Sequence, residues 1–386
     1  MKILIYTHEF IPHKGGVATY NYELARGLTE LGQEVVVLAP RYSDKDIILD
    51  ENLPFKIIRA KLPKRSIMES AWSFLHLPVG VWHFIKVQKQ HRPDYVLVTN
   101  VVAHEYAAAA RLFFTFRFAL TIHGSEIYMH SLGKMINQWL KVPLMQWFFH
   151  KANKIICVSY STQNLLNQKM SNLRDKTSVV YCGIDLNEFS TNKNYKELLR
   201  QFNLANQKVI LTVARLSSGK GQDVVIQALP KLLKEIPNVK YLIVGDGRRR
   251  QELEKLVEKR GLKEAVIFAG AVDHNQLYDF YNVCNIFVML SRRGKKESFG
   301  IVFLEAWAHE KPVIGGNIGG VDEVIDNGET GLLVDPNDVD AAAEAICQLL
   351  ENEDLAVAMG KAGRKKAEKV FSRKAMAQKT LTLLQD

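Results

Sequence analysis

The strongest constraint on the fold is an alternation of short apolar runs with helix-like patterns, which starts at the N-terminus. In the first half of the chain the apolar runs fall at residues 2–6, 34–39, 95–98, 119–122, 155–158 and 178–181. Between the first two runs, apolar residues recur at three- and four-residue spacing up to Leu31, and Gly32 follows, as in an amphipathic helix and its end. Runs without polar alternation are typical of parallel strands that helices cover on both faces. We therefore expect a doubly wound parallel sheet.

The same alternation begins again after a polar stretch, residues 187–206, which we interpret as a linker region. The apolar runs of the second half fall at residues 209–213, 240–244, 266–269, 286–290, 312–314 and 331–334. A chain of 386 residues is also longer than one core usually supports. The predicted fold class is α/β, with two Rossmann-like doubly wound domains whose strands can end at a shared cleft. A basic helix at about residues 355–384 is long enough to cross back, so the expected domains are residues 1–186 with 370–386, and residues 187–369.

The composition is that of an ordinary globular protein, with 47% hydrophobic and 24% charged residues. Four cysteines have spacings that match no zinc or redox motif, which favours a reducing cytoplasm. His8 and Glu9 interrupt the N-terminal apolar run before an export signal could form, and no run is long enough to span a membrane. We expect a cytoplasmic location, with the inner face of the plasma membrane as an open alternative.

A net charge of +10 indicates either an acidic partner or only a solubilising surface. Nucleotide diphosphates, nucleic acid and anionic lipid are the candidate partners. Residues 56–92 are the most biased stretch, with eight basic residues against one acid, Glu69, and with four interleaved aromatic residues. This mixture, together with the segment Arg111–Arg117, suits peripheral contact with an anionic membrane, and an ordinary solvated face explains it equally well.

The segment from Glu297 to Glu305 follows an apolar run and carries two glutamates eight residues apart. We predict that a helix opens at Ser298. Eight residues are about 2.2 helical turns, so a carboxylate in the entry loop and one in the third turn can face the same edge of a ligand. A phosphate would suit the free backbone N–H groups at the helix start, those of Phe299, Gly300 and Ile301. The spacing alone is also compatible with a solvated helix pair.

Two cations follow another apolar run, in the segment Val213-Ala-Arg-Leu-Ser-Ser-Gly-Lys-Gly221. Arg215 and Lys220 would lie at the carboxyl end of a parallel strand, where fixed cations suit a pyrophosphate. The Gly-x4-Gly-Lys-Ser/Thr spacing of a P-loop is absent. A basic turn without a ligand is the plainer alternative.

Glycine-containing turns follow further apolar runs at the same expected edge. Gly245-Asp246-Gly247 comes after residues 240–244, and a glycine-rich turn at residues 315–320 comes after residues 312–314. In the first half, Gly15 and Gly16 stand between a strand and a helix, as in a loop that contacts phosphate or sugar. Glycine permits close backbone approach to a ligand, and tight turns explain it equally well. The Gly-x-Gly-x-x-Gly spacing of a dinucleotide site is missing.

The segment His123-Gly-Ser-Glu126 follows the apolar run at residues 119–122. It would present an imidazole and a carboxylate at the carboxyl edge of the first sheet, where a reacting group is expected. A lone histidine is as often structural, so both interpretations stay open.

The order of these motifs along nearly the whole chain resembles the family 4 retaining glycosyltransferases of GT-B architecture. The motifs are the Gly-Gly loop, His-Gly-x-Glu, Gly-Ile-Asp, Arg-Leu-x-x-x-Lys-Gly, Val-Gly-x-Gly and Glu-x7-Glu. Arg292-Arg-Gly294 leading into Glu297, with the Gly-Ile-Val-x-Leu-Glu run, is most similar to bacterial GDP-mannose-dependent mannosyltransferases of the phosphatidylinositol-mannoside type. The resemblance implies two Rossmann-like domains facing a deep cleft, the N-terminal one on the acceptor side and the C-terminal one binding the nucleotide sugar.

The implied activity is transfer of a hexose, mannose from GDP-mannose first, to a hydroxyl of a glycan or lipid-linked acceptor in cell-envelope polysaccharide or glycolipid synthesis. By the same resemblance, Arg215 and Lys220 would neutralise the diphosphate leaving group, where charge develops. Glu297 would hydrogen-bond the donor sugar, Glu305 would take both ribose hydroxyls, and His123 would lie near sugar and phosphate. The other implied donor contacts are Gly15, Gly16, Gly245, Asp246, Gly247, Ser298, Phe299, Gly300 and Ile301, and the implied acceptor side is His13, Lys14, Glu126 and Asp185.

Two positions depart from the family pattern. Cys182 stands where the family often has Asn before Gly-Ile-Asp, and Ser298 stands where close mannosyl enzymes often carry Gly. No Asp-x-Asp motif stands in a loop suited to a metal, so cationic side chains would replace Mg²⁺, and we expect neither a metal nor another cofactor. Retention requires a covalent intermediate or front-face attack. Since no carboxylate is placed as a nucleophile, we favour front-face attack as a hypothesis.

Three alternatives stay open at this stage. The same reaction could use a UDP-sugar donor, such as UDP-glucose, UDP-GlcNAc or UDP-galactose. A GT-B-like nucleotide-sugar epimerase would share two facing sheets and a diphosphate site. A basic nucleic-acid-binding protein is the third, and we expect no nucleic-acid partner, because the charge is spread over both halves and no helix-turn-helix, zinc-finger or RNP signature occurs.

Overall fold

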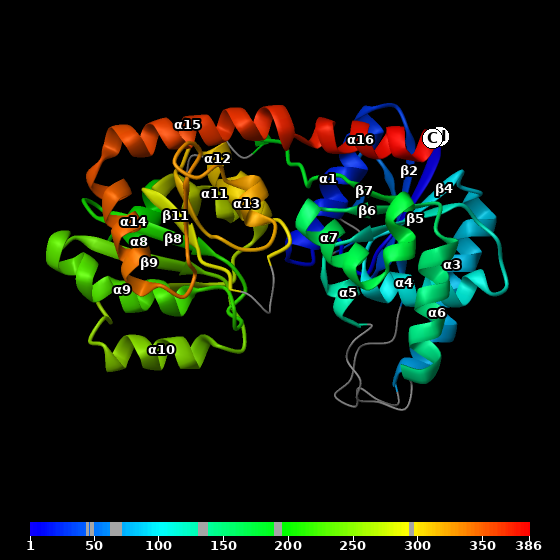
Figure 1. Cartoon of the computed structure of the whole chain (residues 1–386), viewed down its shortest axis with the longest axis horizontal. Helices are drawn as coiled ribbons and strands as arrows, with labels where there is room; N and C mark the ends of the chain where they lie inside the picture. Colours follow the sequence, from blue (N-terminus) through cyan, green and yellow to red (C-terminus); the bar gives the residue numbers. More distant parts are fainter. Residues whose placement is uncertain (44–45, 47–49, 62–71, 130–137, 189–194, 293–296) are drawn as a thin grey trace. The chain divides into compact units, whose positions relative to one another are not determined.

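The computed structural model describes residues 1–43, 46, 50–61, 72–129, 138–188, 195–292 and 297–386, and the chain forms two compact units (Figure 1). Unit 1 comprises Met1–Gly183 and Arg373–Asp386, and unit 2 comprises Ile184–Ser372. The chain therefore passes from one unit to the other after residues 183 and 372, and the predicted boundaries follow residues 186 and 369. The shift assigns Asp185 to unit 2, although it was predicted as part of the N-terminal domain.

Unit 1 is built on a seven-stranded parallel sheet in the order β3-β2-β1-β4-β5-β6-β7. Its strands are β1 (Lys2–Tyr6), β2 (Glu34–Pro40), β3 (Lys56–Ala60), β4 (Tyr95–Val98), β5 (Phe118–Ile122), β6 (Lys154–Cys157) and β7 (Thr177–Val179). Strands β4 and β5 are buried along their whole length, which explains their uninterrupted apolar sequences. Strand β3 was not predicted. Among the described residues it pairs with β2 alone, at the sheet edge, and there a half-exposed strand carries Lys56 and Arg59 instead of a continuous apolar run.

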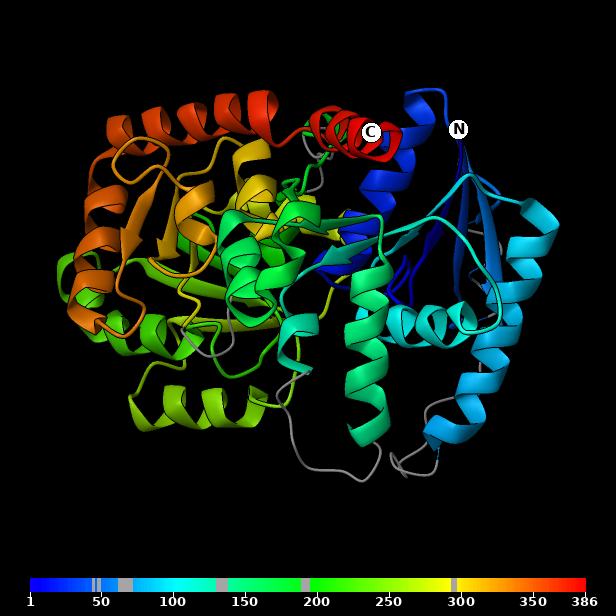
Figure 2. The same ribbon diagram turned by 45° about the vertical axis from the view of Figure 1, so that its right-hand side comes forward.

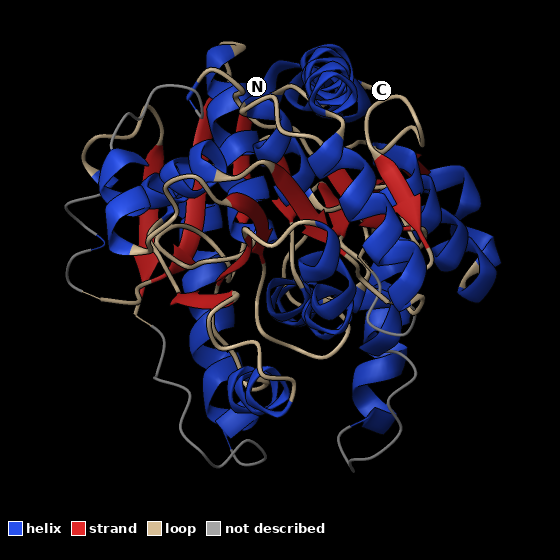
Figure 3. Ribbon diagram, turned by 90° about the vertical axis from the view of Figure 1, so that its left-hand side faces the viewer, coloured by secondary structure: helices blue, strands red, loops and turns tan. Residues whose placement is uncertain are grey.

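Helices lie on both sides of the strands (Figure 3). Those of unit 1 are α1 (Gly16–Glu30), α3 (Trp72–His91), α4 (Val101–Arg111), α5 (Ser125–Met129), α6 (Gln138–Lys151), α7 (Tyr160–Lys169), a 3₁₀ helix at Ser171–Lys176, and α16 (Arg373–Gln385). Helix α4 begins after Asn100, whose side-chain oxygen accepts a hydrogen bond from the Ala103 N–H group (3.0 Å) and so caps the helix. Buried rings join the helices to the sheet; Phe148 of α6 stacks on Phe118 of β5 at 4.4 Å between ring centroids.

Unit 2 is built on a six-stranded parallel sheet in the order β10-β9-β8-β11-β12-β13. Its strands are β8 (Lys208–Val213), β9 (Val239–Val244), β10 (Val266–Gly270), β11 (Ile286–Met289), β12 (Val313–Gly316) and β13 (Leu332–Val334). Its helices are α8 (Tyr195–Gln201), α9 (Gln222–Glu235), α10 (Arg250–Lys259), α11 (His274–Val283), α12 (Ile301–Ala308), α13 (Val321–Val324), α14 (Val339–Glu351) and α15 (Glu353–Val370). Two parallel sheets in one α/β chain confirm the predicted fold class.

Two predictions about connecting segments were wrong. The polar stretch at 187–206 is not only a linker, because it contains helix α8, which packs on α11 within unit 2. The single helix expected at about 355–384 is two helices, α15 and α16, separated at Phe371 and Ser372. At this break, the Ile184 N–H group donates to the Phe371 carbonyl (3.1 Å), so the chain leaves and enters unit 2 at adjacent points.

Helix α16 belongs to unit 1, where it packs on α1 (Figure 2). The Arg373 guanidinium donates to Glu23 Oε2 (2.6 Å) and to Glu30 Oε1 (2.8 Å). The side chains of Arg373 and Glu23 are only 4% and 1% exposed, so removal of either one would break a buried ion pair, which is strongly destabilising. Gly27 lets the two helices approach closely, since an added Cβ would lie 2.8 Å from Ala377 Cβ.

Both sheets have a point where the strand order reverses direction. In unit 1 this point lies between β1 and β4, and in unit 2 it lies between β8 and β11. Open α/β sheets bind ligands beyond the carboxyl ends of their strands at such points, because the two adjacent loops leave in opposite directions. The loops that follow these four strands are therefore the candidate ligand-binding segments. Among the described residues, no helix combines the length and the apolar composition needed to cross a membrane.

Candidate functional site

The reversal point of unit 2 brings two of the predicted residues together. Lys220 comes from the loop after β8, and Glu297 from the segment between β11 and α12. Lys220 Nζ donates to Glu297 Oε2, and both side chains are partly exposed, at 26% and 16%. A half-buried ion pair at this place puts an ammonium and a carboxylate side by side where a ligand can reach both.

Glu297 is held by contacts on its main chain and its side chain. Ser291 Oγ, just beyond β11, donates to Glu297 Oε2 (3.3 Å). The Gly320 N–H group donates to the Glu297 carbonyl (3.2 Å). Gly319, with φ of 65°, lies against the same carbonyl, and a Cβ there would collide with it. The glycine-rich turn after β12 therefore supports Glu297.

Helix α12 begins at Ile301, with Gly300 as its N-cap in the left-handed region (φ 92°), so the helix opens later than the predicted Ser298. Glu305 is accordingly the fifth residue of α12 and lies in its second turn, not the third. Its side chain is buried and accepts a hydrogen bond from the Tyr281 hydroxyl (2.7 Å). The helix start still faces the carboxyl edge of the sheet, and its first N–H groups favour an anion.

Arg215, the second predicted cation, is exposed at the end of β8. Within the described part of the chain, its guanidinium forms no ion pair, and its carbonyl accepts a hydrogen bond from Ser217 N–H (2.8 Å). Lys220 and Arg215 together carry two positive charges against the one negative charge of Glu297. The loop after β8 therefore keeps an excess of positive charge, as a diphosphate site requires.

The glycines after β9 have a structural role in the loop itself. Gly245 (φ 134°) and Gly247 (φ 158°) lie against the carbonyls of Ala214 and Leu216, and a Cβ at either position would collide with them. The Leu216 N–H group also donates to the Asp246 carbonyl (3.0 Å). These glycines thus let the β9 loop pack on the β8 loop, whether or not they also approach a ligand.

In unit 1, His123 and Glu126 follow β5 and are linked through the backbone. Glu126 Oε2 accepts a hydrogen bond from the His123 N–H group (2.9 Å). Burial, and secondarily His104, lowers the pKa of His123 to about 3, so its imidazole is neutral near pH 7. Burial raises the pKa of Glu126 to about 7, against the lowering effect of hydrogen bonds from its own N–H and that of His123. At this edge, burial therefore favours the neutral forms of both His123 and Glu126.

The remaining predicted residues of unit 1 surround the start of α1. Gly15 is the N-cap, with φ of 146°, and Gly16 is the first helical residue; both are exposed. The ring of His13 lies 5.6 Å from that of Tyr42, and Lys14 is exposed. Nothing lies within 4 Å of a Cβ built at Gly15, so space does not require glycine there, while the positive φ does.

Asp185 and the segment at 292–294 complete the predicted set. Asp185 Oδ1 accepts a hydrogen bond from the Asn187 N–H group (3.0 Å) in the turn that opens unit 2, and its place on the acceptor side stays a prediction. Of the Arg292-Arg-Gly294 motif, only Arg292 lies among the described residues. Ser298 is half-buried and Phe299 is buried, with the Phe299 ring 5.4 Å from that of Phe371.

Asp223 forms ion pairs that the sequence patterns do not predict. Its Oδ2 atom accepts from Arg292 Nη1 (2.9 Å), and Arg249 Nη2 lies 3.7 Å away. Asp223 and Arg292 are 69 residues apart, so no spacing pattern could reveal the pair. The weak signal that existed was an acid in the first turn of a helix, directly after the Lys220 loop, and helix capping explains such an acid on its own.

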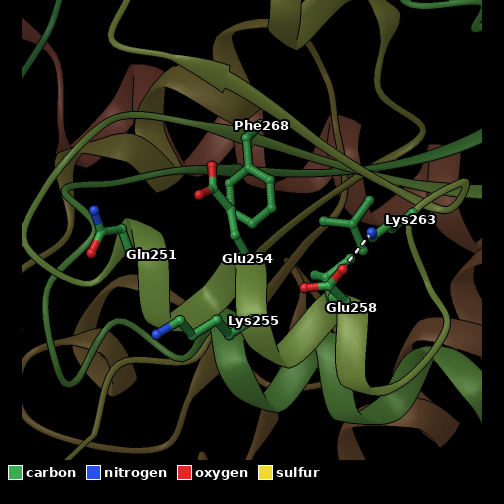
Figure 4. A pocket seen from close by; sticks show the side chains of 8 residues that line it. Gln251, Glu254, Lys255, Glu258, Lys263 and Phe268 are labelled. Carbon is green, nitrogen blue, oxygen red and sulfur yellow. Dashed lines mark hydrogen bonds and ion pairs between the residues drawn. The ribbon is translucent and has the colours of Figure 1, made fainter.

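Two other features of unit 2 lie outside this set. Among the described residues, Glu235, Cys347 and Glu351 are near enough to share a metal ion, but the Cys347 thiol donates to Glu235 (2.7 Å) and burial raises its pKa to about 12, which disfavours the thiolate that a metal needs. A surface hollow of about 590 Å³ lies between α10 and β10, over Phe268, and none of the predicted residues lines it (Figure 4). Two of its charged side chains, Lys263 and Glu258, form an ion pair (2.6 Å).

Comparison with known proteins adds the following. The family "Glycosyltransferase Family 4" matches residues 14–188, and the family "Glycosyl transferases group 1" matches residues 186–366. The chain is 27% identical over 390 residues to the GDP-mannose-dependent alpha-(1-6)-phosphatidylinositol monomannoside mannosyltransferase of Mycobacterium tuberculosis (strain ATCC 25618 / H37Rv), with 94% of this chain and 92% of that protein covered. It is 24% identical over 385 residues to the N-acetyl-alpha-D-glucosaminyl L-malate synthase of Bacillus anthracis, with 97% and 95% covered. Among solved structures, Anabaena HepE in complex with UDP and glucose matches with a TM-score of 0.80 at 23% identity, covering 100% of this chain and 99% of that one.

Proposed function

Because the chain belongs to the glycosyltransferases, with a family 4 domain followed by a group 1 domain in the GT-B fold, it is a hexosyltransferase, and we propose that its donor is GDP-mannose. The acceptor in this proposal is a hydroxyl of a glycan or lipid-linked molecule in cell-envelope polysaccharide or glycolipid synthesis, and the anomeric configuration is retained. The M. tuberculosis relative, a GDP-mannose-dependent enzyme that acts on a phosphatidylinositol mannoside, supports this choice of donor and acceptor.

The contact between Lys220 and Glu297 carries the proposal. When the bond from the sugar to phosphate breaks, negative charge develops on the diphosphate, and a fixed ammonium stabilises it more in the transition state than in the ground state. The carboxylate beside it can accept hydrogen bonds from sugar hydroxyls. One ion pair thus supplies a group for each side of the bond that breaks, and Arg215 adds a second cation on the same loop.

A thermal-shift series tests the choice of donor. The protein is heated with GDP, UDP and ADP, and with GDP-mannose and UDP-glucose, at equal concentrations. A ligand at 100 times its Kd adds about 2.7 kcal/mol to the free energy of unfolding, so the preferred base gives the largest rise in melting temperature. We expect the largest rise with GDP and GDP-mannose. Equal rises with all three diphosphates would contradict a preference for guanine.

A UDP-sugar donor is the second candidate, because HepE, which has the same fold, was solved with UDP and glucose. It differs only in base and sugar, so the diphosphate chemistry at Lys220 is unchanged. A larger thermal shift with UDP than with GDP, followed by sugar transfer from a UDP-sugar, would replace the first candidate with this one.

Retention by front-face attack is part of the proposal. In this mechanism the leaving phosphate helps to deprotonate the acceptor, and no protein carboxylate bonds to the sugar. NMR of the new glycosidic bond should show the anomeric configuration of the donor. Mass spectrometry of the intact protein during turnover should show no glycosyl adduct, and an adduct on Glu297 or Glu126 would contradict front-face attack.

Peripheral contact with an anionic membrane completes the proposal and would bring a lipid-linked acceptor to the enzyme. Phe113 is 82% exposed and Leu112 is 56% exposed in the turn after α4, and Trp82 of α3 is 56% exposed with Lys86 Nζ 5.1 Å from its ring. Helix α3 contains no Asp or Glu. Exposed apolar rings beside cations suit the interface of an anionic bilayer.

Vesicle sedimentation tests this contact. Wild-type protein should sediment with vesicles that contain phosphatidylglycerol at low salt, and much less with pure phosphatidylcholine vesicles. Phe113→Ser should reduce sedimentation. Val357→Ser is the matched control, since Val357 is an exposed apolar residue of unit 2 (45%) and should have no effect. Equal loss with both variants would contradict the proposed surface.

A further inference from the structure

We infer that Asp223 is a positioning residue of the donor site, which holds the three loops after β8, β9 and β11 in one arrangement through Arg292 and Arg249. The inference rests on the proposed function, because it assigns the arrangement to donor transfer. It extends that proposal beyond the residues expected to contact the donor.

The side-chain contacts converge on one carboxylate oxygen. Asp223 lies in the first turn of α9, three residues after Lys220. Its Oδ2 atom accepts from Arg292 Nη1 at 2.9 Å and lies 3.7 Å from Arg249 Nη2. The three side chains are 12%, 27% and 18% exposed, so solvent screens these ion pairs less than pairs at the open surface.

The two arginines lie in the loops that follow two different strands. Arg292 follows β11, and Arg249 stands between β9 and α10. Their backbones repeat the connection that their side chains make. The Arg292 N–H group donates to the Gly219 carbonyl (2.9 Å), and the Arg249 N–H group donates to the Leu216 carbonyl (3.1 Å). Both acceptors belong to the β8 loop, so this loop is fastened to its two neighbours by main chain and side chain together.

The fastened residues adjoin the groups expected to meet the donor. Gly219 directly precedes Lys220, and Arg292 directly follows Ser291, whose hydroxyl donates to Glu297 (3.3 Å). A change at Asp223 would therefore reach both members of the Lys220–Glu297 pair. Because a misplacement of about 1 Å can lower a rate about 100-fold, such a connection matters for the chemical step even without ligand contact.

Charge and position can be separated at this residue. Arg292 pairs with Asp223, and Arg249 pairs with both Asp223 and Glu252, so removal of the Asp223 charge adds one positive charge beside the diphosphate site. Asp223→Asn keeps the shape and one acceptor oxygen, and it should leave the affinity for a free nucleoside diphosphate unchanged or tighter while the loops lose their fixed positions. Arg292→Ala removes a cation together with the connection, so it should lower both affinity and rate.

The experiment measures kcat and KM with the active donor, and Kd for GDP and UDP, in four variants. Asp223→Asn should lower kcat about 10- to 100-fold with Kd within twofold of wild type or lower. Arg292→Ala should lower kcat by a similar factor and raise Kd. The double variant should be no worse than the worse single variant, because both changes break the same connection. The control is Asp340→Asn. Asp340 lies on α14 and forms an exposed ion pair with Lys231, which is on α9 like Asp223, and its replacement should leave kcat, KM and Kd unchanged.

Amide hydrogen exchange gives a readout that does not depend on activity. Exchange at the Arg292 and Arg249 amides should accelerate in Asp223→Asn and not in Asp340→Asn. Three results would each overturn the inference. The first is unchanged exchange together with unchanged kcat in Asp223→Asn. The second is a double variant whose loss of kcat is the product of the two single losses, and the third is a loss of diphosphate affinity in Asp223→Asn equal to its loss of kcat. If Asp223→Asn fails to fold, Arg292→Lys, which keeps the charge, should retain most of the nucleotide affinity and lose kcat. A wild-type protein that transfers no sugar from any nucleotide sugar would contradict the proposed function instead, and exchange at the two amides would still decide on the positioning role.

Discussion

The carboxyl edges of the two sheets share a topology and differ in electrostatics. At the edge of unit 2, ionised side chains from different loops meet in pairs and stay partly exposed, as in Lys220 with Glu297 and Arg292 with Asp223. At the edge of unit 1, Glu126 is buried and His123 is half-buried, and burial shifts the pKa of each in the direction that favours the neutral form. The same topology thus gives one edge with partly exposed ion pairs and one edge whose titratable groups favour their neutral forms.

The difference follows from the partners that each edge provides. In unit 2 the Glu297 and Asp223 carboxylates lie against ammonium and guanidinium groups. In unit 1 the Glu126 carboxyl meets a backbone N–H group of His123, which offsets only part of the cost of burial. A diphosphate site needs the first kind of environment, and a site where a neutral hydroxyl reacts can use the second.

Removal of the Lys220 ammonium should break the comparison most severely. Lys220→Ala takes away the cation nearest to Glu297, and we expect kcat to fall about 100- to 1000-fold, the range for loss of one electrostatic group in a transition state. Steady-state kinetics with the preferred donor measures it. Lys231→Ala, at an exposed position on α9, is the matched control and should change nothing. A loss confined to KM would mean that Lys220 binds ground state and transition state equally.

The two glutamates of the 297–305 segment should separate into two tasks. Glu297→Gln should lower kcat about 10- to 100-fold and spare the affinity for free nucleotide, because it removes a carboxylate expected at the sugar. Glu305→Ala should weaken nucleotide binding. Titration of GDP and UDP against both variants, monitored by calorimetry, gives the comparison. Equal losses of free-nucleotide affinity would contradict the division.

The hydrogen bond from Tyr281 to Glu305 can be removed separately from the Glu305 carboxylate. The Tyr281 hydroxyl donates to Glu305, so Tyr281→Phe removes this contact and keeps the carboxylate. If Tyr281→Phe has a lower melting temperature but the same nucleotide affinity, then helix α12 alone positions Glu305 for nucleotide binding, and the hydrogen bond from Tyr281 contributes only to stability.

Acid and base should destabilise unit 1 through different residues. The pKa of Glu126 is about 7 in the fold against an ordinary 4.5, so its contribution to stability is fully present below about pH 4.5 and is lost as the pH rises through 7. The pKa of His123 is about 3 against 6.5, so its contribution is present above pH 6.5 and is lost as the pH falls toward 3. Between pH 4.5 and 6.5 the two oppose each other.

Thermal unfolding from pH 5 to 8 resolves these contributions. Glu126→Gln should gain a few degrees in melting temperature relative to wild type as the pH rises, because it has no carboxyl to ionise. His123→Gln should show the reverse trend and gain toward pH 5. Parallel curves for wild type and both variants would mean that neither group is held away from its ordinary pKa.

The smallest expected effect is that of metal removal. If Arg215 and Lys220 serve where other enzymes use Mg²⁺, dialysis against EDTA should leave kcat unchanged, and added Mg²⁺ or Mn²⁺ should not raise it. A loss of activity with EDTA that Mn²⁺ restores would show that unit 2 requires a cation beyond its own side chains.

Most of the fold could be predicted from the sequence. The central parallel strands are buried on both faces, and their sequences are therefore continuous apolar runs that predict such strands. Strand β3 was missed because an edge strand is half-exposed and can carry Lys56 and Arg59. The break between α15 and α16 was missed because Phe371 and Ser372 include neither glycine nor proline. At the break the Phe371 carbonyl accepts a hydrogen bond from the distant Ile184 N–H group, and no local pattern reveals this contact.

The site was readable where a motif directly follows a strand. Lys220 and Glu297 were predicted at the same edge and do meet there. The burial of Glu305 under Tyr281 and the contacts of Asp223 were not predicted, because they join residues that only the tertiary fold brings together. Sequence therefore identified the groups that follow strands and missed the contacts that fix their positions.

Helix α16 has a consequence for how the chain folds during synthesis. Unit 1 includes α16, whose Arg373 neutralises the buried Glu23 of α1, yet all of unit 2 is translated between these two helices. Until Arg373 leaves the ribosome, Glu23 has no such partner and one side of α1 remains uncovered. The half that emerges first is thus the half that is completed last, and unit 2, which is contiguous in sequence, can finish folding before it.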